Sequence, residues 1–220
     1  MKIYGCILAA GLGSRLGKYT EANSKWLIEV NGTSLAYRYL KAFWKNNINN
    51  VLIVTGHASQ DLIQSLNSIN KEFNLNLIYV HNQFYSTTNN IYSLDLALKE
   101  VVNRDFDRLI IAECDLFISE EATNSFLKST KGNLLLASPY QYWMDGSCIS
   151  CENEGVVKRL LNKNEVPYDN YSGLFKTVNW YSFDREYIKN KLQPFVNIYN
   201  SKISNISYYK LVIKILLEIS

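Results

Sequence analysis

The sequence predicts an α/β fold with a mixed, mostly parallel central sheet and a strand-rich C-terminal part. Up to about residue 132, short apolar runs alternate with amphipathic segments, a pattern typical of parallel strands joined by right-handed helical crossovers. From about residue 133, four expected strands follow one another through short links. The chain has 220 residues and no linker, repeat or low-complexity segment, so we expect a single domain, 1–220, with halves at about 1–132 and 133–220.

The first half supplies the alternating elements. Residues 3–8 form a short apolar run that predicts a buried strand. Residues 34–46 carry Leu35, Tyr39, Leu40 and Phe43 at helical spacing, with Ser34 as a plausible N-cap. The other elements expected here are strands at 51–55, 75–80 and 109–112 and helices at 59–69 and 89–101.

The second half is expected to form a lid and substrate wall on the same domain. Its expected strands are 134–138, 147–151, 156–161 and 175–183, and its expected helices are 184–192 and 208–218. Open α/β sheets bind ligands outside the carboxyl ends of their strands. The loop after Leu8, the segment after Val80 and the acidic residues after Ala112 all follow such ends, so three parts of the sequence converge on one crevice.

Composition excludes several classes of partner. Hydrophobic residues make up 47% and charged residues 20%, with a net charge of +3 and no basic run of the kind that binds nucleic acid. The apolar stretch 211–217 is short and contains Lys214, so it is not a membrane span. The N-terminus reads as a core strand rather than a signal peptide, and a cytoplasmic location with four reduced, structural cysteines is expected.

A glycine-rich loop follows the first strand. Small residues let backbone N–H groups approach an anion closely, while an arginine and a lysine add charge. The dinucleotide fingerprint does not fit, because the third glycine falls one residue late at Gly17, and the G-K-[ST] of a kinase-type loop is absent. The residues expected to hold the nucleotide phosphates are Leu8, Ala9, Ala10, Gly11, Gly13, Ser14, Arg15 and Lys25.

This loop resembles the L-A-A-G-x-G-[ST]-R-[LM] signature, followed by a lysine, of nucleotidyltransferases, which join a nucleoside triphosphate to a phosphorylated small molecule. The resemblance implies a Rossmann-like, three-layer nucleotide-diphospho-sugar transferase fold. It also implies catalytic roles for Arg15 and Lys25, which would neutralise the triphosphate while the acceptor attacks. The alternative for both residues is that of solvated surface cations.

A polar cluster, 82–94, forms a second diagnostic stretch. Amide and hydroxyl groups at a helix start suit a base edge or a ribose, although simple capping of the helix is the alternative. The pattern N-x-x-Y-x-x-x-N-N-x-Y-S-L resembles that of phosphocholine cytidylyltransferases, in which this segment lines the pocket. By that resemblance Asn90 and Ser93 contact the nucleotide and Tyr92 the acceptor.

Two further stretches are expected to bind the acceptor. Residues 138–146 place Tyr142 and Trp143 beside Asp145, and aromatic faces with a carboxylate suit an ammonium group. Residues 175–183 resemble the K-T-V-N-x-Y segment of cytidylyltransferases for 2-aminoethylphosphonate and phosphoglutamine. That resemblance implies a catalytic Lys176, on the acceptor phosphate or the α-phosphate, and an acceptor-binding Asn179; a surface lysine in an aromatic core strand is the alternative.

Asp115 is the expected magnesium ligand. It follows an apolar strand, where a carboxylate can hold a Mg²⁺ ion that bridges phosphates. Capping of the following helix is the alternative, but Ser119 is the better cap. Glu113 ranks lower, since it is expected to point to the other face if the strand persists.

The resemblances together imply an enzyme that transfers CMP from CTP to a small phosphorylated, amine-bearing acceptor and releases pyrophosphate. In the family that it resembles, such activated head groups decorate surface polysaccharides. A sugar-1-phosphate nucleotidyltransferase and a binding module without turnover are the alternatives. The module is favoured by Lys210, where relatives often have glutamate, and by the lack of a further acidic strand after Glu218, which would suit a truncated relative. The oligomeric state, with a homodimer as one option, is left open.

Overall fold

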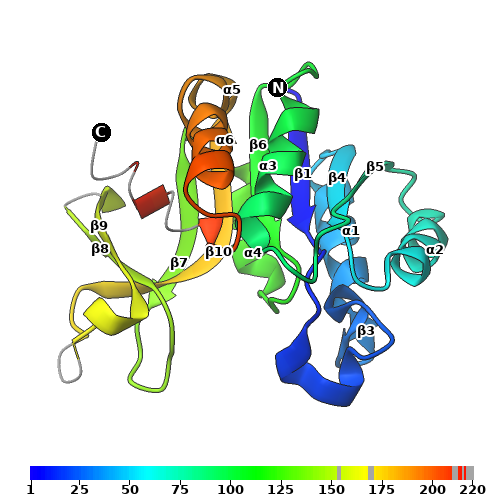
Figure 1. Ribbon diagram of the computed structural model, residues 1–220, viewed down its shortest axis with the longest axis horizontal. Coiled ribbons are helices and arrows are strands. Elements are labelled where there is room, and N and C mark those ends of the chain that lie inside the picture. The colour runs from blue at the N-terminus through cyan, green and yellow to red at the C-terminus, as the bar shows by residue number, and fades with distance from the viewer. Residues whose placement is uncertain (153–154, 168–170, 210–212, 215, 217–220) are drawn as a thin grey trace.

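A central eight-stranded sheet organises the computed structural model, which describes residues 1–152, 155–167, 171–209, 213–214 and 216 (Figure 1). The strand order is β5-β4-β1-β6-β10-β8-β9, and β7 also pairs with β10. The strands are β1 Ile3–Leu8, β4 Asn50–Thr55, β5 Asn76–His81, β6 Arg108–Glu113, β7 Leu134–Pro139, β8 Cys148–Cys151, β9 Val157–Leu161 and β10 Leu174–Asp184.

The parallel and antiparallel parts of the sheet meet at β6. Strand β1 pairs in parallel with β4 and with β6, and β4 in parallel with β5. Strand β10 runs antiparallel to β6, β7 and β8. The predicted mixed, mostly parallel sheet with a strand-rich second half is therefore confirmed, and β10 is the element that joins the two halves.

Helices cover both faces of the sheet. In β1, Cys6 and Leu8 face the helices α3 and α6, whereas Ile7 faces α1, α2 and α4, because successive strand residues point to opposite faces. The two resulting apolar layers explain why the parallel strands are apolar along their length. The helices are α1 Leu35–Lys45, α2 Ser59–Asn70, α3 Asn90–Val101, α4 Glu120–Lys128, α5 Arg185–Tyr187 and α6 Gln193–Lys202.

Most element boundaries agree with the sequence to within a residue or two. Ser34 and Ser119 accept hydrogen bonds from Tyr37 N and Ala122 N, so both predicted caps are confirmed. The predicted helix 184–192 ends too early: a π-helical turn, Ile188–Leu192, connects α5 to α6, where Pro194 lacks the N–H that an uninterrupted α-helical ladder needs. Most of the predicted helix 208–218 lies outside the described residues.

Short elements complete the fold. A hairpin of β2, Glu29–Val30, and β3, Thr33–Ser34, precedes α1, and 3₁₀ turns occur at Ser14–Tyr19, Lys25–Leu27 and Lys163–Glu165. The four cysteines are free thiols, as expected. Within the described part of the chain, no helix has the length and apolar character needed to cross a membrane.

Candidate active site

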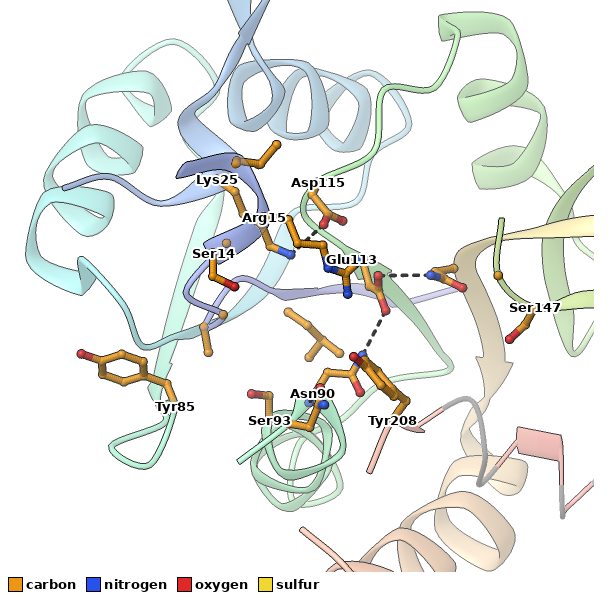
Figure 2. A pocket seen from close by; sticks show the side chains of 18 of the residues that line it. Ser14, Arg15, Lys25, Tyr85, Asn90, Ser93, Glu113, Asp115, Ser147 and Tyr208 are labelled. Carbon is orange, nitrogen blue, oxygen red and sulfur yellow. Dashed lines mark hydrogen bonds and ion pairs between the residues drawn. The ribbon is translucent and has the colours of Figure 1, made fainter. Parts of the chain in front are cut away.

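One cavity of about 640 Å³ opens at the carboxyl ends of β1 and β6, and both halves of the chain line it. Figure 2 shows its side chains converging from the loop after β1, the start of α3, the end of β6 and the β10 side. Such a volume lies within the range typical of ligand pockets. The first-half residues in its lining are Leu8, Ala10, Gly11, Gly13, Ser14, Arg15, Leu16, Lys25, Asn82, Tyr85, Thr88, Asn89, Asn90, Ser93, Glu113 and Asp115.

The glycine loop adopts a backbone that needs glycine at its turn. Gly13 has φ 69° and starts the 3₁₀ turn Ser14–Tyr19, and Thr20 Oγ1 donates to its carbonyl at 2.9 Å. The structure brings the predicted loop residues to the cavity with one exception. Ala9 is fully buried and its N–H donates to the Val54 carbonyl at 2.9 Å, so it extends the sheet instead of lining the cavity.

Lys25 and Asp115 form an ion pair inside the cavity. Lys25 Nζ lies 2.7 Å from Asp115 Oδ2, and Lys25 begins the short turn Lys25–Leu27, which Ser24 caps by accepting from Trp26 N. Burial alone would lower the pKa of Lys25. The negative charge of the neighbouring segment, which carries Glu113 and Asp115, has the larger effect, so the pKa of Lys25 is raised. Lys25 is thus held as a cation beside the carboxylate.

Glu113 faces the cavity, which corrects the expectation that it points away. Glu113 is the last residue of β6 and Asp115 lies in the turn that follows, and both side chains line the cavity. Glu113 Oε1 accepts from Asn90 Nδ2 at 3.0 Å and its Oε2 from Asn179 Nδ2 at 3.1 Å, as the dashed lines of Figure 2 show. The signal for Glu113 in the sequence was its place at the carboxyl end of a strand, where ligands of open α/β sheets bind.

The start of α3 carries an ordered amide and hydroxyl network. Asn82 Nδ2 donates to Ser93 Oγ at 3.1 Å, while Asn82 Oδ1 accepts from Phe84 N at 2.9 Å. Asn89 rather than Asn90 accepts from a backbone N–H at the helix start, and Asn90 and Ser93 both line the cavity. Tyr92, the expected acceptor contact, lies outside the lining and packs edge-on against Phe84.

The second half contributes a polar wall. Its lining residues are Asp145, Gly146, Ser147, Asn162, Lys163, Lys176, Asn179 and Tyr208. Asp145 pairs with Lys163 at 2.9 Å, and the hydrogen bond from Lys163 lowers the pKa of Asp145. Lys176 Nζ donates to the Thr177 carbonyl at 3.0 Å. The sequence did not single out Ser147, Asn162, Lys163 or Tyr208 as site residues, since they lie outside the strands and only tertiary contacts bring them to the cavity.

Two predicted aromatic contacts lie elsewhere. Tyr142 is 80% exposed and Trp143 68% exposed, and neither lines the cavity. They sit in the loop between β7 and β8, which reaches the cavity only at Asp145–Ser147 through a turn at Gly146, whose φ is 101°. Among the described residues, the aromatic side chains that line the cavity are Tyr85 and Tyr208. Tyr142 and Trp143, which were expected to join Asp145 in the acceptor site, therefore do not line the cavity with it.

The donors near Asp115 suit a hard cation. Asp115 presents its carboxylate to the cavity, and Mg²⁺ in nucleotide sites is typically held by one or two carboxylates together with phosphates and waters. Among the described residues, no cluster of three or more histidine, cysteine, aspartate or glutamate side chains could hold a metal by itself. The residues therefore fit an ion that arrives with a triphosphate better than a closed protein site.

Comparison with known proteins identifies the class. The model of the MobA-like NTP transferase domain matches residues 5–143, and the chain belongs to this family. The fold is that of nucleotidyltransferases. A choline-phosphate cytidylyltransferase from Haemophilus influenzae is 40% identical over 91 residues, which is 41% of this chain and 36% of that protein.

Two further relatives extend over most of the chain. A CMP-5'-(3-aminopropyl)phosphonate synthase from Streptomyces rubellomurinus is 23% identical over 204 residues, 92% of this chain and 32% of that protein. The solved CTP:phosphocholine cytidylyltransferase from Streptococcus pneumoniae superposes with a TM-score of 0.76 at 18% identity, covering 100% of this chain and 87% of that one. The match covers about a third of the length of the Haemophilus influenzae protein and of the Streptomyces rubellomurinus protein.

Proposed function

We propose that this protein is a CTP-dependent cytidylyltransferase that transfers CMP to a small phosphorylated, amine-bearing acceptor of the phosphocholine, 2-aminoethylphosphonate or phosphoglutamine type. The observation that carries the proposal is the single cavity shared by a phosphate-type glycine loop and a lysine-bearing second wall. Named relatives that act on choline phosphate and on aminophosphonates support this choice of nucleotide and acceptor.

In the proposed reaction, a phosphoryl oxygen of the acceptor attacks the α-phosphorus of CTP. A new P–O bond forms, the bond between the α-phosphorus and the bridging oxygen breaks, and pyrophosphate leaves with its electron pair. The acceptor oxygen is already ionised at neutral pH, so no dedicated general base is needed. The work of the protein is then positioning and charge stabilisation.

The lining residues divide this work. Arg15 and Lys25 would neutralise the triphosphate, and the raised pKa of Lys25 keeps it cationic over the neutral range. Lys176, on the opposite wall, would hold the phosphoryl group of the acceptor. Asp115 would hold Mg²⁺, which when bound supplies charge neutralisation across the phosphates.

The lining also favours a second candidate. Asp145, Ser147, Asn162 and Asn179 offer acid, hydroxyl and amide groups of the kind that bind sugar hydroxyls, whereas Tyr142 and Trp143 lie outside the cavity. A sugar-1-phosphate nucleotidyltransferase would use the same loop and the same second wall. The two candidates differ in nucleotide and acceptor, so one experiment separates them.

The test is pyrophosphate release with CTP, UTP, ATP and GTP at equal concentration, each combined with phosphocholine, 2-aminoethylphosphonate, phosphoglutamine and a hexose 1-phosphate. The proposal expects the fastest turnover with CTP and one of the first three acceptors. Faster turnover with UTP and the hexose 1-phosphate would replace it by the sugar candidate. Tight CTP binding without turnover on any acceptor would leave a binding module. A cytidylylated product would suit decoration of surface polysaccharides, a role that we include in the proposal.

A further inference from the structure

We propose that Glu113 is a positioning residue that holds the nucleotide half and the acceptor half of the cavity in register. Its carboxylate receives one amide from each half: Asn90 of α3 at 3.0 Å and Asn179 of β10 at 3.1 Å. Figure 2 shows Glu113 joined to Asn90 by one of the two dashed lines that end on its carboxylate. The consequence for catalysis rests on the proposed function, whereas the contact itself does not.

The orientation of the Asn90 amide follows from its second partner. Asn90 Oδ1 accepts from the backbone N–H of Tyr209 at 3.0 Å, and a backbone N–H can only donate. The other end of the amide, which meets Glu113, is therefore the NH₂ group, so Glu113 is an acceptor. Asn90 thus ties three parts of the chain together: α3, the end of β6 and the segment around Tyr209.

Asn179 reaches Glu113 from a distorted strand. Its φ is 55°, and the pairing of β10 with β7 shifts between Thr177 and Tyr181. Asparagine tolerates this left-handed conformation better than most residues, and a bulge of this kind re-aims a side chain. Asn179 Oδ1 lies 3.3 Å from Thr177 Oγ1, which leaves its NH₂ group directed at Glu113. The left-handed backbone conformation of Asn179 thus directs its side chain to the contact between the two halves.

Donor and acceptor exchange tests the contact. In Glu113→Gln the side chain offers one acceptor and one donor, so one of the two amides meets another donor. In Asn179→Asp two carboxylates oppose each other. In the double variant Glu113→Gln/Asn179→Asp the carboxamide at position 113 again donates to a carboxylate at position 179 and accepts from Asn90, and the net charge equals that of the wild type. Glu113→Gln/Asn90→Asp repeats the exchange on the other side.

The readouts are kcat, KM for CTP and for the acceptor, the magnesium concentration for half-maximal rate, and the urea midpoint of unfolding. Displacement of reacting groups by about 1 Å can cost on the order of 10²-fold in rate. We therefore expect each single variant to lose about tenfold to a hundredfold in kcat/KM, with the acceptor KM most affected in Asn179→Asp. Both double variants should recover to within a few-fold of wild type, and the magnesium requirement should not change. Glu121→Gln, on the exposed start of α4, is the matched control and should behave as wild type.

Three outcomes would overturn the proposal. A Glu113→Gln variant that needs tenfold or more magnesium and that neither second substitution rescues would make Glu113 a metal ligand instead. Single variants with wild-type kinetics would remove any role. Additive losses in the double variants would show that the contact does not couple the two halves. If the wild type binds CTP without turnover, the proposed function fails. The same set of single and double variants, measured by CTP affinity and by the urea midpoint, then still shows whether Glu113 couples the two halves of the cavity.

Discussion

At the scale of single residues, the proposed binding of the CTP triphosphate depends on two positive charges in the segment after β1. Arg15 and Lys25 both follow β1 and both line the cavity, but only Lys25 has a carboxylate partner in Asp115 among the contacts that the structure describes for the two. Removing either charge should leave the core intact because both side chains lie on loops.

We predict that Arg15→Ala and Lys25→Ala each lower kcat by about 10²-fold or more, the typical cost of losing one group that stabilises transition-state charge. Steady-state pyrophosphate release measures the loss, and far-UV circular dichroism reports the fold. Lys18→Ala is the matched control, since Lys18 belongs to the same 3₁₀ turn as Arg15 and lies outside the cavity lining. Equal rates for all three variants would exclude the phosphate-binding role of the loop.

Asp115 separates a metal role from a structural one. Ser119, not Asp115, caps α4, so the capping alternative no longer explains the carboxylate. We predict that Asp115→Asn loses most of its turnover at ordinary magnesium, because a neutral amide is a weak ligand for a hard cation, and that Mn²⁺ partly restores it. Turnover titrated against each metal tests this. Asp61→Asn, exposed on α2, is the control. Undiminished turnover in Asp115→Asn would discard the metal role.

At the scale of elements, the glycine loop is fastened to its neighbours by backbone contacts. His57 N donates to the Ala10 carbonyl at 3.0 Å, and His57 Nε2 lies 2.8 Å from the Thr20 carbonyl, so this nitrogen carries the proton. Thr20 in turn donates to the carbonyl of Gly13. The loop after β4 therefore contacts both ends of the phosphate loop after β1, an arrangement that no local sequence pattern predicts.

Gly56 makes this close approach possible. A Cβ at position 56 would lie 2.6 Å from the Ala10 carbonyl oxygen and 2.6 Å from Tyr85 Cβ, so one of the two loops must move. We predict that Gly56→Ala lowers the free energy of unfolding by roughly 1–3 kcal/mol, as overpacking typically does, and weakens CTP binding. Urea unfolding and calorimetry measure the two effects.

Gly132→Ala is the control for this substitution, because its Cβ would approach no described atom more closely than Asp184 Oδ2 at 3.7 Å, an ordinary contact. The control should keep wild-type CTP affinity. If Gly56→Ala also kept it, the fastening of the phosphate loop by the neighbouring loop would not matter for the nucleotide.

At the scale of the whole molecule, local pattern predicted the parallel half well and the second wall poorly. The strand 3–8 and its glycine loop are readable from consecutive residues, since strand, turn and charge follow in order. Glu113 and Asn179 are 66 positions apart in the sequence. They meet only because β10 lies antiparallel to β6, while the pairing of β10 with β7 shifts its register next to Asn179. Tyr142 and Trp143 had a suitable composition for a site, but the loop that carries them reaches the cavity only further along, at Asp145–Ser147. Local propensity thus predicts elements, whereas tertiary pairing decides which side chains share a cavity.

The buried titratable groups make the folded molecule sensitive to alkali. Burial raises the pKa of Cys6 and of Cys114 from 9.0 to about 12, and it also raises the pKa of Tyr39, Tyr181 and Tyr209. Between pH 9 and 12 the unfolded chain loses thiol protons that the folded chain keeps. This contribution to stability is therefore complete below pH 9 and is lost as the pH rises toward 12.

We predict that the free energy of unfolding falls by up to about 1.4 kcal/mol per pH unit for each buried thiol above pH 9, while it changes little between pH 7 and 8. Urea unfolding at half-unit pH steps measures the slope. Cys6→Ala should lower stability at pH 7 through the lost packing but should flatten the alkaline slope by the share of one thiol. A Val54→Ala variant, which removes buried volume without a titratable group, should keep the wild-type slope. Equal slopes in Cys6→Ala and Val54→Ala would show that the Cys6 thiol does not couple folding to pH.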